Sequence, residues 1–171
     1  MKKISLLLTA IFLMAGTAFA QKYGFVDTEY ILNNIPSYAA AQEKLDGFSE
    51  GWEKEISDAY AEVEKMYKDY QNEVVLLSRE AKIRREEEII AREKEAKDLQ
   101  NKYFGVEGEL YTKRQELIQP IQDEIYNAIK EIAVDGSYAV IFDTSSGMNM
   151  LYTNPKYDVS DEVLEKLGYK N

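Results

Sequence analysis

Apolar residues recur at steps of three and four positions through residues 37–119, a stretch that contains no proline. Such steps place apolar side chains on one face of an α-helix. The first half of the stretch carries this pattern at Leu45, Phe48, Trp52, Ile56, Tyr60, Val63, Tyr67, Tyr70, Val74 and Leu77. From Tyr60 onward the steps follow a heptad repeat, which is typical of a coiled coil. We therefore predict a helix over 37–77, with Ser37 as its N-terminal cap.

The apolar residues of the second half mirror those of the first. In five matched pairs the two residue numbers add to 155: Tyr38 with Leu117, Leu45 with Leu110, Trp52 with Tyr103, Ile56 with Leu99, and Met66 with Ile89. A constant sum is expected for two antiparallel helices, because each step along one helix matches a step back along the other. The turn between them then falls between Leu77 and Ser78, and Ser78 suits the cap of the returning helix.

The returning helix is predicted to run from Ser78 to Asp135 with one kink. Its apolar stripe comprises Ile83, Ile89 or Ile90, Ala96, Leu99, Tyr103, Val106, Leu110 and Leu117. Pro120 lies inside this helical pattern and removes one backbone hydrogen bond, so it predicts the kink. Pro36 stands level with Pro120 just before the first helix. The two prolines are therefore predicted to mark the base of the helical arm.

The remaining elements are short. The sequence predicts a strand at 22–27, a helix at 29–32 capped by Asp27 or Thr28, a β-hairpin of 138–143 with 148–152, and a helix at 161–167 between Ser160 and Gly168. Together these elements predict an α+β fold, a long antiparallel helical hairpin on a small β body. So few strands leave sheet edges uncovered. We therefore expect an oligomer in which the strands of several chains close on each other.

The first twenty residues are typical of a signal peptide. Lys2 and Lys3 precede an apolar stretch, and Ala18-Phe19-Ala20 is the small-x-small pattern of a cleavage site. We expect export and cleavage after Ala20. No cysteine follows, so a lipid anchor is not expected.

The chain then divides into two predicted regions. Residues 37–119 form the helical-hairpin arm, with its turn near 77–78. Residues 21–36 and 120–171 form the β-containing oligomerisation body.

The amino-acid composition argues against several classes of function. Removing Lys2 and Lys3 leaves 19 basic residues against 31 acidic ones, a net charge of −12. This charge argues against general nucleic-acid binding, which needs a basic face. The chain contains no histidine and no cysteine, which removes most zinc sites, histidine-containing triads and thiol chemistry. We expect no cofactor, no metal and no enzymatic activity; Asp27 and Asp143 stand at strand ends, where capping is the simpler role.

The order of elements resembles that of the Skp/OmpH family of periplasmic chaperones over the whole mature chain. The most specific stretches are Lys22–Asp27, Leu117–Ile125, Gly136–Asp143 and Asp158–Leu164. The resemblance implies a homotrimer whose shared β-barrel carries three helical tentacles around a cavity. It implies an ATP-independent holdase that keeps unfolded outer-membrane proteins from aggregating in the periplasm of a Gram-negative bacterium. The best-known members are basic, and because this chain is acidic no lipopolysaccharide site is carried over.

Four basic residues gather beside the predicted turn: Arg79, Lys82, Arg84 and Arg85. With only Glu80 among them, they could make weak contact with a membrane surface or with acidic segments of an unfolded protein. The alternative is a solvated tip whose arginines pair with Glu86–Glu88 along the helix.

Aromatic residues are frequent in the arm. Five are expected to fill the line of contact between the helices: Trp52, Tyr60, Tyr67, Tyr70 and Tyr103. Phe104 and Tyr111 lie off that line, so they are the better candidates for contact with an unfolded client.

Four glycines lie at similar levels of the two helices: Gly47, Gly51, Gly105 and Gly108. Glycine inside a helix costs up to about 1 kcal/mol relative to alanine. One interpretation is a soft joint that lets the arm splay. The other is close packing against Phe48, Trp52 and Tyr103.

Two classes of function remain open at this stage. The first is the holdase chaperone, which needs distributed weak contacts and no catalytic residues. The second is a structural or adaptor coiled coil of the cell envelope, which would bind a specific folded partner and leave aggregation unaffected.

Overall fold

The computed structural model describes residues 21–147 and 150–169. The predicted signal peptide lies outside these residues. Contacts divide the chain into two compact units, Asn33–Glu124 and a second unit made of the residues up to Leu32 with those from Ile125 onward. We call the first unit the arm and the second the body. A membrane-spanning helix needs a longer run of apolar residues than any helix in the described part of the chain contains.

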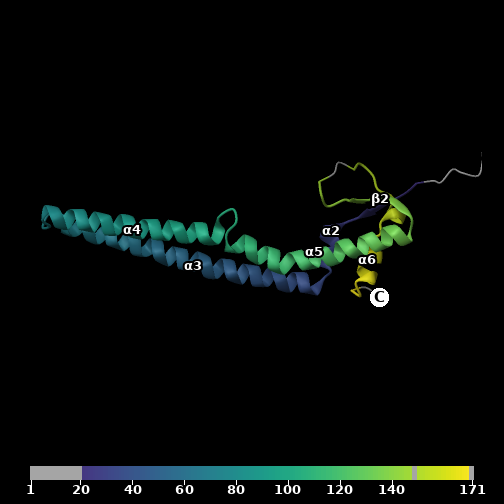
Figure 1. The fold of residues 1–171 in the computed structure, drawn as a ribbon, viewed down its shortest axis with the longest axis horizontal. Coiled ribbons are helices and arrows are strands. Elements are labelled where there is room, and N and C mark those ends of the chain that lie inside the picture. Colours follow the sequence, from purple (N-terminus) through teal and green to yellow (C-terminus); the bar gives the residue numbers. More distant parts are fainter. Residues whose placement is uncertain (1–20, 148–149, 170–171) are drawn as a thin grey trace, which may run out of the picture. The chain divides into compact units, whose positions relative to one another are not determined.

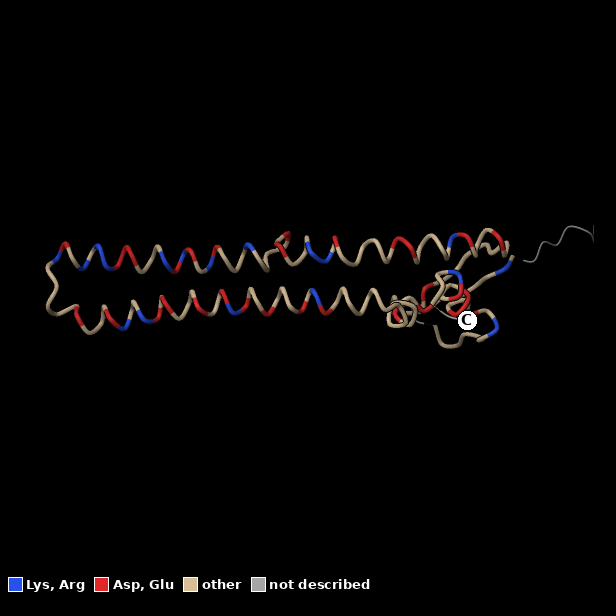
Figure 2. Tube along the Cα trace, turned by 90° about the horizontal axis from the view of Figure 1, so that it is seen from below, with Lys and Arg blue, Asp and Glu red and all other residues tan. Residues whose placement is uncertain are grey.

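The arm is built on two long antiparallel helices. Helix α3 (Pro36–Glu73) and helix α4 (Arg79–Phe104) lie side by side, joined by a short turn (Figure 1). Charged residues are spread along the whole length of both helices (Figure 2). Ser78 caps α4 as predicted, since its side chain accepts a hydrogen bond from the Ala81 amide at 3.2 Å. The predicted Ser37 cap is wrong: α3 begins at Pro36, whose fixed φ and missing N–H suit the first helical position.

The returning helix is interrupted, contrary to the prediction of one helix from Ser78 to Asp135. Helix α4 ends at Phe104, and helix α5 (Glu109–Asp135) begins after a loop that bulges outward (Figure 1). We call residues 105–108 the helix break. Val106 is 96 % exposed there, so its predicted place in the apolar stripe is wrong.

Glycine is required at both ends of the helix break. A Cβ at Gly105 would lie 2.3 Å from the carbonyl oxygen of Asn101, and one at Gly108 would lie 2.7 Å from that of Tyr103. Real Cβ atoms do not approach backbone oxygen so closely. Close backbone approach is a frequent reason for glycine.

Helix α5 continues through Pro120 and ends at Asp135, as predicted. The kink at Pro120 stays a prediction. The buried residues of α5 alternate in steps of three and four, as on the face of an amphipathic helix: Ile118, Ile121, Ile125, Ala128 and Ile132.

The body contains a two-stranded parallel sheet. Strand β1 (Lys22–Val26) pairs with strand β2 (Tyr138–Asp143), with Phe25 opposite Phe142. The predicted hairpin of 138–143 with 148–152 is therefore wrong over residues 150–152, which form no strand; residues 148–149 lie outside the described residues. β2 instead takes its partner from the other end of the sequence. The Thr144 amide extends that pairing by donating to the Val26 carbonyl at 2.7 Å.

Short helices complete the body: α2 (Thr28–Asn33), the 3₁₀ turn η2 (Pro155–Tyr157) and α6 (Ser160–Lys166). Asp27 caps α2 by accepting from the Tyr30 amide at 2.9 Å. Ser160 does not cap α6, because its hydroxyl accepts from the Asp27 amide and donates to Asp158. Gly168 ends α6 with φ +81°, a left-handed conformation that suits glycine. The body core contains Val26, Ile31, Val159, Val163 and Leu164.

Candidate functional site on the helical arm

An aromatic cluster joins α3 to α4 next to the helix break. The Trp52 and Tyr103 rings stack with centroids 4.9 Å apart and planes inclined by 9°. Phe48 also stacks on Trp52, with centroids 5.5 Å apart. Tyr103 is buried and its hydroxyl donates to Glu55 at 2.7 Å. The predicted pairing of Trp52 with Tyr103 is confirmed.

Beyond the helix break, one contact between α3 and α5 departs from the constant sum. On the α5 side, the Lys113 ammonium lies 5.9 Å from the Phe48 ring centroid. These two residue numbers add to 161, whereas a constant sum of 155 would place residue 107 opposite Phe48. Residues 105–108 belong to neither α4 nor α5, so they interrupt the continuous helix that a constant sum assumes.

Phe104 and Tyr111 flank the helix break in sequence. Phe104 is the last residue of α4, is 36 % exposed, and meets Trp52 edge-on at 6.3 Å. Tyr111 lies in the first turn of α5 and is 50 % exposed. Both rings are accessible, and their role as client contacts stays a prediction.

The four glycines do not behave as matched pairs. Gly47 and Gly51 lie inside α3, and a Cβ added to either would meet nothing within 4 Å. Close packing against aromatic residues is therefore wrong as the reason for these two. Gly105 and Gly108 instead form the helix break. At the level of the predicted joint, only the returning helix is interrupted, since α3 is continuous through Gly47 and Gly51. The flexibility of the joint stays a prediction.

The turn between α3 and α4 is apolar and exposed. Val75 and Leu76 are 82 % and 84 % exposed. Arg85 forms ion pairs with Glu88 at 3.1 Å and with Glu73 at 3.9 Å, as the alternative interpretation expected. The other three basic residues of the turn are Arg79, Lys82 and Arg84. Within the described residues, none of them forms an ion pair closer than 4.0 Å.

A groove of about 590 Å³ runs between α3 and α4 on the turn side of the aromatic cluster. Six apolar or aromatic residues line it: Tyr60, Val63, Tyr67, Tyr70, Ile89 and Ile90. We call it the tyrosine groove. Tyr60 and Tyr67 are 39 % and 53 % exposed, so the expectation that they only fill the helix contact is wrong.

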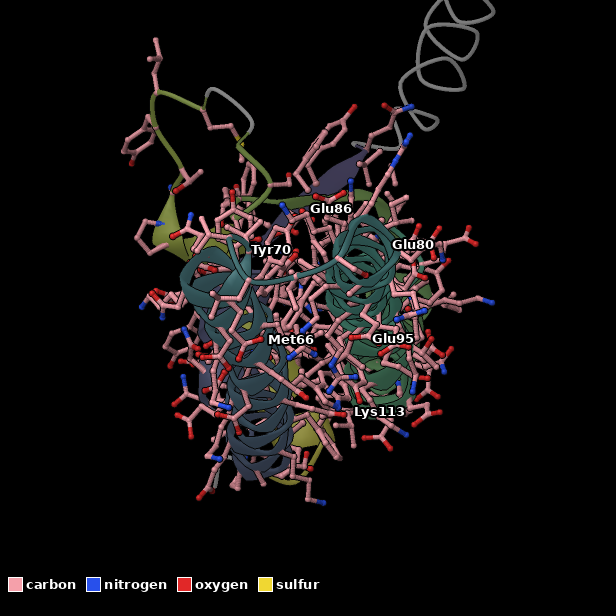
Figure 3. The ribbon with its side chains drawn as sticks, turned by 90° about the vertical axis from the view of Figure 1, so that its left-hand side faces the viewer. Met66, Tyr70, Glu80, Glu86, Glu95 and Lys113 are labelled. Carbon is pink, nitrogen blue, oxygen red and sulfur yellow. The ribbon has the colours of Figure 1, made fainter. Side chains whose placement is uncertain are left out.

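Carboxylates stand along the tyrosine groove. Glu64, Glu86 and Glu93 are the remaining lining residues. The Tyr70 hydroxyl donates to Glu86, and this bond raises the pKa of Tyr70. Seen along the arm from its turn, Tyr70 and Glu86 point toward the layer between the helices, whereas Glu80 points away (Figure 3). Hydrogen bonding to Lys68 lowers the pKa of Glu64.

A second groove between the same helices, about 400 Å³ in volume, has a different character. Arg92 lies in it and binds Glu62 at 2.5 Å and Glu95 at 2.6 Å. Hydrogen bonds to Glu95 and Glu62 raise the pKa of Arg92. We call it the charged groove, because an arginine and two carboxylates of its own lining pair with each other.

The sequence patterns did not predict the tyrosine groove. Its signal was present: between Tyr60 and Tyr70 the first helix offers tyrosine where a two-stranded coiled coil prefers leucine or another aliphatic residue. The ambiguity between Ile89 and Ile90 was a second sign, since Ile89 is buried while Ile90 is 64 % exposed. Both isoleucines contribute to the groove.

The two strand-end aspartates serve the fold of the body. Burial acts to raise the pKa of Asp143, but hydrogen bonds from Thr28 and Ser145 outweigh it and lower that pKa. Asp27 has a separate role, since it caps α2. In the part of the chain that the structure describes, no group of three or more acidic side chains could hold a metal ion.

Comparisons with known proteins agree over nearly the whole chain. A family described as "Outer membrane protein (OmpH-like)" matches residues 22–167. An uncharacterised protein of Aquifex aeolicus (strain VF5) is 29 % identical over 167 residues, which span 98 % of this chain and 96 % of that protein. A crystal structure from Caulobacter crescentus CB15, of a candidate outer membrane chaperone (OmpH-like), is similar in fold with a TM-score of 0.68. It is 12 % identical, and the match covers 86 % of this chain and 83 % of that one.

Proposed function

Since the chain belongs to the OmpH-like family of outer membrane proteins, we propose that it is an ATP-independent holdase chaperone. Its clients would be unfolded outer-membrane proteins, which it keeps from aggregating. The observation that carries this proposal is the accessible apolar and aromatic surface of the arm: Tyr60, Tyr67, Ile90, Phe104 and Tyr111. Such surface offers many weak contacts to an unfolded chain without any catalytic group.

The decisive experiment is an aggregation assay with the purified mature protein, residues 21–171. An unfolded β-barrel membrane protein is diluted from urea without ATP, and light scattering is followed. Suppression at a stoichiometric amount of the assembled protein supports the proposal. A folded protein, verified by circular dichroism, that leaves scattering unchanged overturns it and favours the envelope adaptor.

We also propose that the body assembles into a homotrimer with a shared barrel. In the described residues, Asp158 and Val159 pair with β1 at Phe25, whereas β2 has no strand beside its other edge. Such an uncovered edge favours pairing with other chains. Large exposed residues of the body support the same idea: Tyr126, Val134, Leu151 and Tyr152. Sedimentation equilibrium at several concentrations tests it, and a monomer would contradict it.

Location and contact roles complete the proposal. The protein would act in the periplasm after cleavage behind Ala20, which N-terminal sequencing of the protein from the envelope fraction tests. Phe104 and Tyr111 would contact clients beside the helix break. The glycines Gly47, Gly51, Gly105 and Gly108 would let the arm splay, above a base marked by Pro36 and Pro120. Finally, the basic residues Arg79, Lys82, Arg84 and Arg85 would allow weak contact with a membrane surface.

A further inference from the structure

The tyrosine groove exposes apolar surface that the two helices of the arm do not cover. Its volume of about 590 Å³ falls within the range of roughly 300–1,000 Å³ that is usual for ligand sites. Ile90 is 64 % exposed and Tyr67 is 53 % exposed, so both can be touched by a bound segment. The lining is mostly apolar and the groove is open, which suits an extended chain with large side chains.

The charge of the tyrosine groove is uncompensated. Its lining residues include Glu64, Glu86 and Glu93 but no lysine or arginine. Glu64 is satisfied by Lys68 at 2.6 Å. In the part of the chain that the structure describes, the ion pairs within 4.0 Å include neither Glu86 nor Glu93. A cation brought by a ligand would therefore find two carboxylates and three tyrosine rings, and both kinds of group attract cations.

The charged groove provides an internal comparison. There Arg92 already bridges Glu62 and Glu95, so that groove holds a cation of its own, and its apolar lining consists of Ala59, Ala96 and Leu99 without an aromatic ring. The arm thus has one groove in which an arginine already pairs with two carboxylates. In the other, Glu86 and Glu93 face no lysine or arginine of the lining and lie beside exposed tyrosine and isoleucine.

We propose that the tyrosine groove binds extended segments in which an aromatic or branched apolar side chain stands beside a lysine or arginine. The apolar side chain packs against Tyr67 and Ile90, and the cation lies near Glu86 and Glu93. This proposal rests on the chaperone function proposed above and names the kind of client segment that the arm selects.

The test uses the mature protein and two short unstructured peptides that carry a fluorescent label. Both alternate phenylalanine with serine; one carries lysines and the other carries glutamates at the same positions. Fluorescence anisotropy measures their binding. We expect the lysine peptide to bind about fivefold more tightly, as for a partly exposed charge pair.

Matched variants locate the effect. Glu93→Lys is expected to weaken binding of the lysine peptide about fivefold and to favour the glutamate peptide. Glu87→Lys makes the same charge change on an exposed residue of α4 outside the groove and is expected to have little effect. Likewise Ile90→Ser should weaken the binding of both peptides. Ile83→Ser should leave their binding unchanged, since Ile83 is 47 % exposed and does not line the groove.

The outcomes separate this proposal from the chaperone function. Equal binding of the two peptides, or equal effects of Glu87→Lys and Glu93→Lys, overturns the proposal. If the protein suppresses aggregation and Ile90→Ser does so equally well, the groove proposal fails while the function stands. If the expected peptide preference is found without any suppression of aggregation, the client assignment is overturned. A lower assembly mass for Tyr67→Ser or Ile90→Ser in sedimentation would make the groove a contact between copies and overturn the proposal.

Discussion

Trp52 of α3 lies nearly flat against Tyr103 of α4, with ring planes inclined by 9° and centroids 4.9 Å apart. This pair stands immediately before the helix break and is hydrogen-bonded through Tyr103 to Glu55. It therefore fixes the two helices to each other at the level where the returning helix is interrupted. The surrounding cluster adds Phe48 and Phe104 to the contact.

Truncation of this aromatic pair should loosen the arm. Trp52→Ala is expected to lower the free energy of unfolding by about 2 kcal/mol, since a partly buried aromatic loses both apolar contact and stacking. Urea denaturation followed by circular dichroism measures it, because Trp52 is the single tryptophan and its fluorescence is lost. Tyr111→Ala is the control, and an equally large loss there would contradict a special role for the pair.

The glycines of α3 and those of the helix break should respond in opposite directions to substitution by alanine. Gly47→Ala and Gly51→Ala are expected to stabilise by about 0.5–1 kcal/mol each, because both lie in a helix with free space around the new Cβ. Gly105→Ala and Gly108→Ala should destabilise the arm, since their Cβ atoms would meet backbone oxygen. Urea denaturation of the four single variants checks the signs.

Spin labels on α3 and α5 then test the joint. With Gly47 and Gly51 replaced by alanine, which the structure accommodates, the joint hypothesis expects a narrower distribution of distances between the labels. An unchanged distribution would eliminate that hypothesis.

The turn of the arm should bind anionic vesicles through its basic residues and through its exposed apolar residues. A charge near such a surface contributes about 1 kcal/mol, so a triple variant with alanine at Arg79, Lys82 and Arg84 is expected to bind at least about tenfold more weakly. Arg85→Ala should change binding less, since Arg85 is already paired with Glu88. Val75→Ser with Leu76→Ser should weaken binding while leaving its salt dependence intact. Vesicle co-sedimentation at two salt concentrations measures these effects; equal effects of Arg85→Ala and the triple variant would contradict the prediction.

The body should lose stability in acid through Asp143. Its pKa in the folded state is lowered from 3.8, because the charged form accepts hydrogen bonds from Thr28 and Ser145. Folding therefore favours the deprotonated form, and this contribution is present above pH 3.8 and disappears as the pH falls through the folded pKa. Asp143→Asn is expected to be less stable at neutral pH, with a flatter decline below about pH 4. Thermal melts from neutral pH down to about pH 3 test this, and parallel curves for both proteins would contradict it.

Local patterns predicted the helices of the arm well. The steps of three and four located α3 and α4, and the constant sum correctly paired Trp52 with Tyr103. Ser78 was recognisable as a cap because a side chain that accepts from the helix start is a local device. Each of these features depends on residues close in sequence or on one repeated step.

Other features depend on contacts that no local pattern contains. β2 carries a strong strand signal, but its partner is β1 rather than the neighbouring 148–152, and the sequence alone does not rank a near partner against a distant one. The helix break was hidden because Val106 fits the apolar stripe, although Gly105 and Gly108 form close backbone contacts. The tyrosine groove follows from how completely side chains fill the space between two helices, which requires their positions as well as their order.

The pairing of β1 with β2 also affects the order in which the parts of the chain fold. Lys22 lies opposite Tyr138, and more than a hundred residues separate the partners in the chain. Closing so long a loop costs conformational entropy before the pairing is formed, whereas α3 and α4 need only one short turn. We therefore expect the arm to gain protection first and β1 last, which pulse-labelled hydrogen exchange during refolding would detect. Because β1 stays unpaired the longest, premature association between folding chains would begin at this strand.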